Sequence, residues 1–270
     1  MNIIITGASK GFGLALAVAF IKNGDSVFIG ARKTTPDIDL LLDKNSKVAW
    51  HKLDISNEDS VREFTKAAGL HFNGIVDVLI NNAGIYGPMG SLETVNIKEW
   101  VDAIQTNLIG TVYMCQHTLP YLKKSKLASI INLSGGGATA PMPNLSSYAA
   151  SKAAVVRFTE TLAEELRKDG ISVNAVAPGA LNTDMLDAIL AAGPEKVGKE
   201  FYDKSLSQKS SGGTDMSKGT DLCLYLAKNK PVTGKLISAV WDKVETLTDT
   251  IDKSDIYTLR RIVPSDRGHA

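Results

Sequence analysis

The sequence IIITGASKGFG at positions 3–13 places a short run of isoleucines directly before a glycine-rich turn. The apolar-periodic segment 14–21 follows it, and this order predicts a strand, a phosphate-binding loop and a helix. Glycines at 7, 11 and 13 permit a tight turn and let a diphosphate approach the backbone closely. Because unpaired N–H groups and the positive end of the helix dipole face the turn, the stretch predicts a nucleotide site.

Length and composition agree with one soluble α/β domain. The chain has 270 residues, of which 44% are hydrophobic and 22% charged, and its formal net charge is +1. This balance gives no reason to expect nucleic acid or a membrane as a partner. The apolar run 14–21 is too short to span a bilayer, and a first strand at about residue 2 leaves no room for a signal peptide.

Cysteine and histidine usage favours a cytoplasmic protein without a metal. Cys115 and Cys223 lie far apart in helical contexts, which predicts two reduced, buried thiols. The four histidines show no metal-ligand spacing, so no metal site is expected.

Strand and helix patterns alternate along most of the chain. The predicted strands are Ile3–Ile5, Ser26–Gly30, Val48–Trp50, Val76–Ile80, Ser129–Leu133, Ser172–Val176 and Lys235–Val240. The predicted helices lie near 13–23, 57–70, 97–122, 148–168 and 216–228. Several strands are apolar throughout, as expected where helices cover both faces of a parallel sheet. The sequence therefore predicts a single doubly wound α/β domain with seven parallel strands and ligands at their carboxyl ends.

Residues 184–214 interrupt this alternation. Gly193-Pro194, Gly198 and the glycines at 212–213 punctuate short helical pieces, which indicates a substrate lobe or lid, the alternative being a surface excursion. Its expected apolar lining is Met185, Leu186, Ile189, Leu190, Phe201 and Tyr202. Its lysines, Lys196, Lys199, Lys204 and Lys209, form either an attractor for anionic substrates or, as we favour, a solvated face.

Tyr148 and Lys152 stand four residues apart, hence on one face of a helix, one turn from each other. A tyrosine has a reference pKa of about 10 and is a poor proton donor or acceptor near neutrality. A cation one turn away favours the phenolate and lowers that pKa, which brings the phenol closer to the range useful for acid–base catalysis.

Over roughly residues 1–240 the chain resembles the short-chain dehydrogenase/reductase family, whose fold is the doubly wound (Rossmann) sheet. The resemblance is carried by motifs in the family's order and spacing. They are Thr6-Gly-x-x-x-Gly-x-Gly13, Asp54, Asn81-Asn82-Ala83-Gly84, Asn107, Tyr148-x-x-x-Lys152, Pro178-Gly179 and Thr183.

The resemblance implies transfer of hydride between a nicotinamide and a carbonyl or secondary alcohol. Tyr148 would be the general acid or base, and Lys152 would lower its pKa and bind the ribose. Asn107 would sit at a break in its helix and help hold a water in a proton relay to Lys152. The implied cofactor-binding residues are Gly7, Ser9, Lys10, Gly11, Phe12, Gly13, Arg32, Asp54, Asn81, Ala83, Gly84, Tyr148, Lys152, Pro178, Gly179 and Thr183. The segment 82–84 is also expected to be a turn that packs the central sheet.

One position departs from the family pattern. The family has a serine thirteen residues before the tyrosine, and here that position is Gly135, with Ser134 one place earlier. Adjacent residues of an extended strand face opposite ways, but the glycines at 135–137 allow a twist that brings Ser134 inward. Ser134 is therefore the candidate donor to the substrate carbonyl, and Thr139, Ser147, a water or a backbone N–H are the alternatives.

The charged residues near the glycine loop predict which dinucleotide, NAD(H) or NADP(H), is bound. Enzymes that use NAD place an acidic residue at the end of the second strand, about 20 residues past the glycine loop. Here Ala31 takes that place, Arg32 follows it, and Lys10 lies inside the loop. Two cations without a carboxylate favour a 2′-phosphate, so NADP(H) is expected.

The chain continues beyond the expected end of the domain at residue 240. The extension 241–270 contains the pattern Ser254–Arg261, which predicts a short capped helix. It could pack on the sheet edge, contact a neighbouring subunit or border the pocket.

The family implies a homodimer or homotetramer, and the apolar stripe Val155, Phe158, Leu162 and Leu166 suits either an interface or the core. The sequence thus predicts an NADP(H)-dependent enzyme acting on an unidentified small molecule. The alternative is a dinucleotide-binding regulatory protein that has lost catalysis, of which Gly135 would be the sign.

Overall fold

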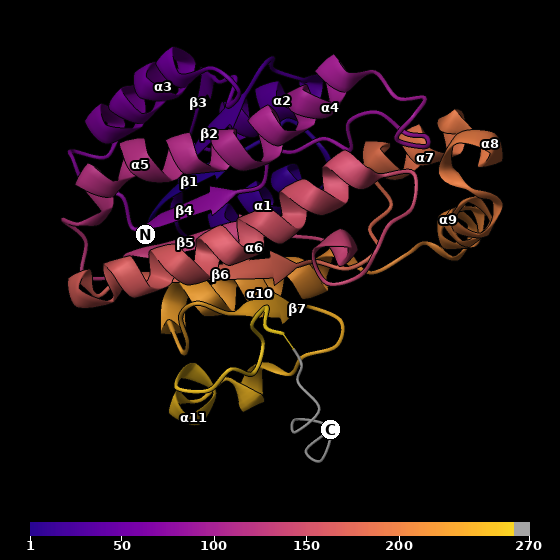
Figure 1. Cartoon of the computed structure of the whole chain (residues 1–270). Helices are drawn as coiled ribbons and strands as arrows, with labels where there is room; N and C mark the ends of the chain where they lie inside the picture. Colours follow the sequence, from indigo (N-terminus) through magenta and orange to yellow (C-terminus); the bar gives the residue numbers. More distant parts are fainter. Residues whose placement is uncertain (262–270) are drawn as a thin grey trace.

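The computed structural model describes residues 1–261, which form one α/β domain around a parallel sheet (Figure 1). The strand order is β3-β2-β1-β4-β5-β6-β7, so the order reverses between β1 and β4. The strands are β1 (Asn2–Thr6), β2 (Ser26–Ala31), β3 (Val48–Lys52), β4 (Val78–Asn81), β5 (Ser129–Leu133), β6 (Ser172–Ala177) and β7 (Leu236–Ser238). The predicted doubly wound fold with seven strands is confirmed, and ligands of such sheets bind where the order reverses.

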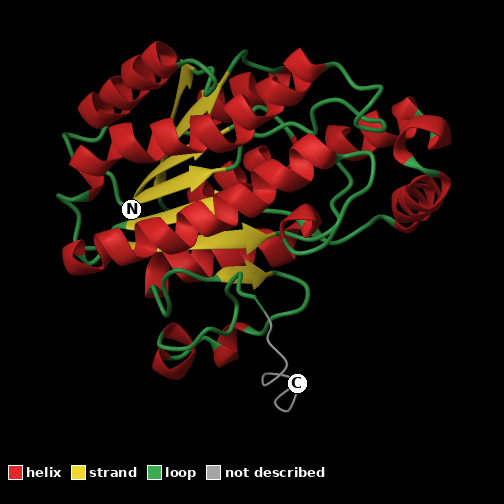
Figure 2. Ribbon diagram, viewed as in Figure 1, coloured by secondary structure: helices red, strands yellow, loops and turns green. Residues whose placement is uncertain are grey.

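Both faces of the sheet are covered by helices, as the ribbon in Figure 2 shows. The α-helices before the lobe are α1 (Gly11–Lys22), α2 (Pro36–Lys44), α3 (Glu58–His71), α4 (Ile97–Ile104), α5 (Gly110–Leu122) and α6 (Ser146–Leu166). The helix α10 (Met216–Asn229) follows the lobe and packs beside α1. The sequence did not predict α2, which begins at Pro36 after the capping residue Thr35.

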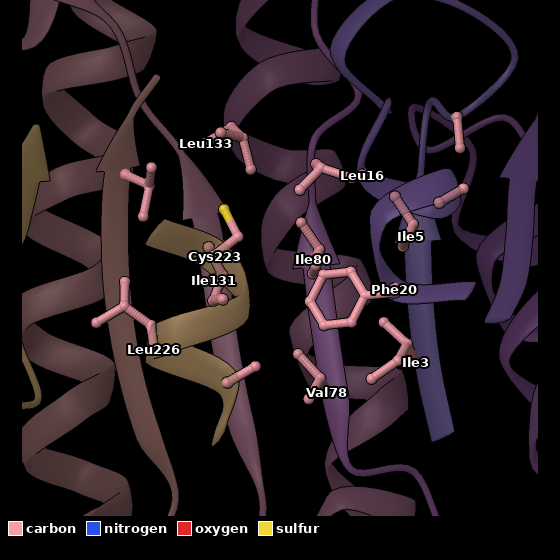
Figure 3. Packing of buried hydrophobic residues seen from close by; sticks show 14 of the residues in the cluster. Ile3, Ile5, Leu16, Phe20, Val78, Ile80, Ile131, Leu133, Cys223 and Leu226 are labelled. Atoms are coloured by element: carbon pink, nitrogen blue, oxygen red, sulfur yellow. The ribbon is translucent and has the colours of Figure 1, made fainter. Parts of the chain in front are cut away.

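The central strands are mostly apolar because they are buried on both sides, whereas the edge strand β3 ends in His51 and the exposed Lys52. Ile3 and Ile5 pack with α1 and α10 on one face, while Ile4 joins the cluster under α3, α5 and α6. Figure 3 shows Phe20 of α1 and Leu226 of α10 against the strands of the first face. Cys115 and Cys223 are both free and buried. These two layers fix the strand ends at which the site is built.

The predicted helix 97–122 is broken in its middle. Between α4 and α5 the backbone adopts a π-helix at Gln105–Ile109, and Asn107 is its central residue. The resemblance implied a break at this residue, and the structure confirms it. A π-bulge displaces the side chains it contains from the regular helical faces, and such bulges are frequent at functional sites.

The predicted lobe is a set of three helices that projects from the sheet (Figure 1). They are α7 (Asp184–Ala192), α8 (Pro194–Val197) and α9 (Lys199–Ser211). Gly193, Gly198 and Gly212 follow them with φ of 78°, 87° and 90°, a conformation that disfavours other residues. The interpretation of these glycines as helix boundaries is confirmed.

The predicted helix at Ser254–Arg261 is wrong. The nearest helix is α11 (Asp249–Asp252), and Ser254 closes it by donating to Ile251 O at 2.9 Å. The residues that follow form hydrogen bonds with other elements instead of with each other. For example, Leu236 N of β7 donates to Tyr257 O at 2.8 Å. Asp, Ile, Tyr and Thr are all weak helix formers, so bonds to the sheet edge prevail over local capping. Within the described residues the extension packs on the sheet edge of its own chain.

Candidate active site

A single cavity of about 900 Å³ runs along the carboxyl ends of the strands. Its walls come from the loops after β1 to β6, from α7 and α9 of the lobe, and from the segment after β7. The predicted site residues that line it are Gly7, Ser9, Lys10, Phe12, Gly13, Arg32, Asp54, Ala83, Gly84, Ser134, Tyr148, Lys152, Pro178, Gly179 and Thr183. Gly11, Asn81 and Asn107 are not among its lining residues.

The glycine loop is closely packed against the loop after β4. A Cβ on Gly7 would come within 2.7 Å of Ala83 Cα, and a Cβ on Gly13 within 2.4 Å of Gly7 O. Asn82 Nδ2 donates to Thr6 O at 2.9 Å and to Gly7 O at 3.1 Å. The expected packing role of 82–84 is confirmed by these contacts. They hold the N-terminus of α1 toward the cavity, a cradle that fits a diphosphate.

Asp54 and Asn81, both expected to bind the cofactor, differ in orientation. Asp54 lines the cavity, and its Oδ1 accepts from Ser56 N at 3.0 Å and from Ser56 Oγ at 2.6 Å. The side chain of Asn81 is buried and donates to Asn132 Oδ1 at 2.9 Å and to Cys115 Sγ at 3.3 Å. Asn81 therefore faces the core instead of the cavity.

Asn107 fixes the loop that follows β4. Its Oδ1 accepts from Ile85 N at 2.8 Å, and its Nδ2 donates to Ile85 O at 2.8 Å and to Ser151 Oγ at 2.9 Å. Gly84 lies between Asn107 and Lys152, since a Cβ there would be 3.1 Å from Asn107 Oδ1 and 3.6 Å from Lys152 Nζ. Asn107 thus fixes the backbone at Ile85, next to Gly84 and Lys152, through these hydrogen bonds.

Lys152 is a buried cation held at the end of β5. Its Nζ donates to Leu133 O at 2.7 Å and lies 5.8 Å from the centroid of the Tyr148 ring. Burial lowers the pKa of Lys152 to about 8, because a charged ammonium loses its hydration inside the protein.

Tyr148 is buried against a second tyrosine. The ring centroids of Tyr86 and Tyr148 are 4.7 Å apart, and burial, followed by the charge of Tyr86, raises the pKa of Tyr148 above its usual range. The lowering of this pKa by Lys152 stays a prediction, since burial and Tyr86 cause the raised pKa and Lys152 Nζ is directed to Leu133 O. With its pKa raised, Tyr148 is a neutral phenol at pH 7.

Gly135 leaves the space that the Tyr148 hydroxyl occupies. A Cβ on Gly135 would lie 2.4 Å from Tyr148 Oη, so the hydroxyl occupies the space that a side chain at 135 would need. Ser134 is buried, lines the cavity, and its Oγ has no hydrogen-bond partner within residues 1–261. An unpaired buried hydroxyl costs stability, and this Oγ is shielded from solvent although the residue lines the cavity.

The two cations expected at the 2′-phosphate are both exposed and line the cavity. Arg32 forms no ion pair within the described part of the chain. Lys10 pairs with Asp184, the first residue of α7, which also lines the cavity. Lys10 must exchange this carboxylate for any phosphate that it binds.

The lobe supplies apolar groups to the cavity and keeps its cations outside. Met185, Leu186, Ile189 and Phe201 line the cavity, whereas Leu190 and Tyr202 do not. The lobe lysines are absent from the lining, and three of them pair with carboxylates of the lobe: Lys199 with Asp203, Lys204 with Glu200 and Lys209 with Asp187. This arrangement agrees with a solvated face.

Residues 1–192 match the family model for short chain dehydrogenases, which covers most of the chain. The chain belongs to the short-chain dehydrogenase family. A 3-ketodihydrosphingosine reductase of Bacteroides thetaiotaomicron is 33% identical over 236 residues, 85% of this chain and 84% of that protein. Oxidoreductase BOA17 of Botryotinia fuckeliana is 36% identical over 182 residues, which span 67% of this chain and 65% of that protein.

A solved structure supports the same assignment. The crystal structure of an actinorhodin polyketide ketoreductase with NADPH is 27% identical and has a TM-score of 0.77. The alignment covers 87% of this chain and 94% of that one. The protein is thus an oxidoreductase of the short-chain dehydrogenase family, a family that uses a nicotinamide cofactor.

The sequence did not predict several residues that surround this site. The Tyr86 ring packs against the Tyr148 ring at an angle of 60°, Ser151 Oγ accepts a hydrogen bond from Asn107, and Asp184 pairs with Lys10. Trp241 and Tyr257 of the C-terminal extension line the cavity. Only Ser151 could have been found from the sequence, since it lies inside the Tyr-x-x-x-Lys motif.

The helices of the described residues include none long and apolar enough to cross a membrane, and these residues contain no group of three or more potential metal ligands.

Proposed function

We propose that the protein is an NADP(H)-dependent carbonyl reductase in which Tyr148 donates the proton and Ser134 holds the carbonyl oxygen. The observation that carries this proposal is that one cavity is lined both by Tyr148, a buried neutral phenol, and by Ser134, whose buried hydroxyl has no hydrogen-bond partner within the described residues. A neutral phenol is ready to give a proton, which favours reduction over oxidation at neutral pH.

When bound, a nicotinamide cofactor would supply the hydride for the carbonyl carbon. Tyr148 gives its hydroxyl proton to the carbonyl oxygen as negative charge develops there, and the Ser134 hydroxyl donates a second hydrogen bond to that oxygen. Lys152, held at Leu133 O, is a cation within reach of the phenol and favours the phenolate that remains after proton transfer. Asn107 keeps the backbone beside Lys152 in place.

Charge supports NADP(H) over NAD(H). Arg32 is exposed, lines the cavity and is unpaired within the described residues, and Lys10 lies at the glycine loop. A guanidinium binds a phosphate through two parallel hydrogen bonds, which suits Arg32 to a 2′-phosphate. Gly7, Ser9, Phe12 and Gly13 would hold the diphosphate, and Pro178, Gly179 and Thr183 the nicotinamide end.

The decisive experiment measures NADPH consumption with a panel of ketones, aldehydes and quinones, using the wild type and Tyr148→Phe. We expect turnover by the wild type and a loss of about 10²–10⁴-fold in the variant, the usual contribution of a positioned proton donor. NADPH binding by Tyr148→Phe is the control. Tight NADPH binding without turnover on any substrate would favour a regulatory binding protein, the reading that Gly135 suggests.

We also infer a homo-oligomer in the cytoplasm. Ile97 and Val101 lie one turn apart on α4 with exposed side chains, which supports an interface there. Of the apolar stripe on α6, Leu162 and Leu166 pack in the core of the chain itself. The two free cysteines suit a reducing compartment. A mass near the 28.9 kDa of one chain in light scattering would contradict the oligomer.

A further inference from the structure

The loop after β4 brings a second tyrosine ring against Tyr148. The ring centroids of Tyr86 and Tyr148 lie 4.7 Å apart, and the ring planes are tilted by 60°. Aromatic pairs in this range attract each other beyond the effect of the area that they bury. Both residues line the cavity, and Tyr148 is only 8% exposed. Tyr86 therefore covers part of the ring that carries the proton.

The hydroxyl of Tyr148 is positioned without a hydrogen bond. The backbone O of Tyr148 accepts from Ser151 Oγ at 2.7 Å, but among residues 1–261 its Oη has no hydrogen-bond partner. Lys152 does not hold it, because Lys152 Nζ donates to Leu133 O at 2.7 Å. A tyrosine side chain can rotate between several staggered orientations, so packing has to select the one that is observed.

Two contacts confine the phenol. Gly135 lies at its hydroxyl end, since a Cβ on Gly135 would be 2.4 Å from Tyr148 Oη. Tyr86 lies against its ring, and within the described residues it is the one aromatic ring in contact with Tyr148. Gly135 leaves room for the hydroxyl but has no side chain to restrain the ring. Restraint of the ring thus falls to Tyr86.

Tyr86 stands on a fixed stretch of backbone. On one side, Ile85 N donates to Asn107 Oδ1 and Ile85 O accepts from Asn107 Nδ2, both at 2.8 Å. The carbonyl of Tyr86 itself accepts from Ser147 Oγ at 3.2 Å, in the first turn of α6. On the other side, Gly87 has a φ of 73°, and a Cβ on it would lie 2.7 Å from Ser147 Oγ. These contacts hold the Tyr86 ring in place against its neighbour.

We propose that Tyr86 is a positioning residue for Tyr148: its ring, and not its hydroxyl, holds the phenol in the orientation from which the proton is given. This inference rests on the proposed carbonyl reductase function. Without the Tyr86 ring, Tyr148 gains space and further orientations. One aromatic contact changes an equilibrium between two orientations by about tenfold, so the fraction of molecules ready for proton transfer should fall by that factor.

Steady-state kinetics test the positioning role, with NADPH and the carbonyl compound of the panel that is reduced fastest. We expect Tyr86→Ala to lower kcat about tenfold and to leave KM for NADPH within about twofold. Tyr86→Phe keeps the ring and should recover most of the lost kcat. The matched control is Tyr202→Ala, which removes a half-buried tyrosine of α9 that does not line the cavity, and should leave kcat unchanged.

Ionisation of Tyr148 gives a readout that needs no turnover. Two titratable groups face Tyr148, namely Tyr86 and Lys152. Burial, followed by the charge of Tyr86, raises the pKa of Tyr148. Tyr86→Ala admits water and removes that charge, so it should lower the pKa of Tyr148 toward the ordinary value of about 10. Tyr86→Phe keeps the cover and should leave the pKa raised, as should Tyr202→Ala.

The titration follows the ultraviolet absorbance of phenolate, as the difference between each protein and its Tyr148→Phe counterpart, over the pH range in which circular dichroism shows a folded chain. If no carbonyl compound is reduced but Tyr86→Ala alone shifts the titration, the reductase proposal fails and the positioning of Tyr148 by Tyr86 stands. If reduction occurs and Tyr86→Ala keeps the wild-type kcat and titration, the positioning role is overturned. Equal losses of kcat in Tyr86→Phe and Tyr86→Ala would also overturn it, because the hydroxyl would then be the group that acts.

Discussion

The glycine loop and the lobe line the same cavity but differ in what they present to it. At the glycine loop, backbone packs on backbone, and a Cβ on Gly7 or Gly13 would come within 2.7 Å or 2.4 Å of neighbouring main-chain atoms. The lobe instead presents the apolar side chains of Met185, Ile189 and Phe201. Added atoms should therefore abolish function at the glycine loop and at Tyr148, whereas changes in the lobe lining should alter only specificity.

The largest expected effect comes from Gly135→Ala. Gly135 has an extended backbone with φ of −173°, which any residue adopts, so the variant changes space and not backbone strain. The added Cβ would lie 2.4 Å from Tyr148 Oη and must displace the phenol. We expect kcat/KM for carbonyl reduction to fall by more than about 100-fold, as misplacement of a catalytic group by about 1 Å can cause.

Gly136→Ala is the matched control for this prediction, because a Cβ at Gly136 would meet nothing within 4 Å. Steady-state assays of both variants should separate them clearly. Equal activity of the two would show that Tyr148 does not depend on the space left by Gly135.

The cofactor end gives the next largest effect. The double variant Lys10→Ala/Arg32→Ala should raise KM for NADPH by about tenfold or more and barely change KM for NADH, because each lost cation removes attraction for a 2′-phosphate. Asp184→Asn is the complementary control, since it frees Lys10 from its ion pair and should leave or lower KM for NADPH. Similar changes for both cofactors would mean that these cations do not bind the 2′-phosphate.

A smaller effect, on stability, is expected at Lys152. Burial lowers the pKa of Lys152 from 10.5 to about 8, so below pH 8 the native state carries a buried charge that opposes folding. Lys152→Met should raise the free energy of unfolding at pH 7 by about 2 kcal/mol, after allowing for the lost bond to Leu133 O, while abolishing activity.

The pH dependence checks the sign of this prediction. Between pH 8 and 10.5 the unfolded chain binds the lysine proton and the native protein does not, so wild-type stability rises relative to the variant. Urea denaturation at pH 7 and pH 10 should show the advantage of Lys152→Met shrinking. A variant less stable than the wild type at pH 7 would contradict a destabilising buried charge.

The same contrast explains how far the sequence could predict this protein. The phosphate loop, the strands and the Tyr148–Lys152 pair depend on short-range patterns such as the sequence at 3–13, and the sheet positions them as expected. The break at Asn107 was implied by the family and is a π-helix.

Contacts between distant segments could not be predicted. The bonds of Leu236 with Tyr257 and of Glu160 with Leu259 determine the course of the extension, and they replace the expected helix at Ser254–Arg261. The pKa of Tyr148 also depends on burial and on Tyr86, neither of which the i, i+4 spacing reveals. Likewise, nothing in the local sequence indicates that Lys10 pairs with Asp184.

The most direct test of the central claim, that Tyr148 protonates a carbonyl held by Ser134, is the rate of NADPH-dependent ketone reduction by Ser134→Ala. We predict a fall in kcat of about 10²-fold, because a donor to the developing oxyanion is lost. Thermal stability should be unchanged or slightly higher, since Ser134 Oγ is buried without a partner within residues 1–261. A kcat within about twofold of the wild type, at unchanged stability, would contradict the account.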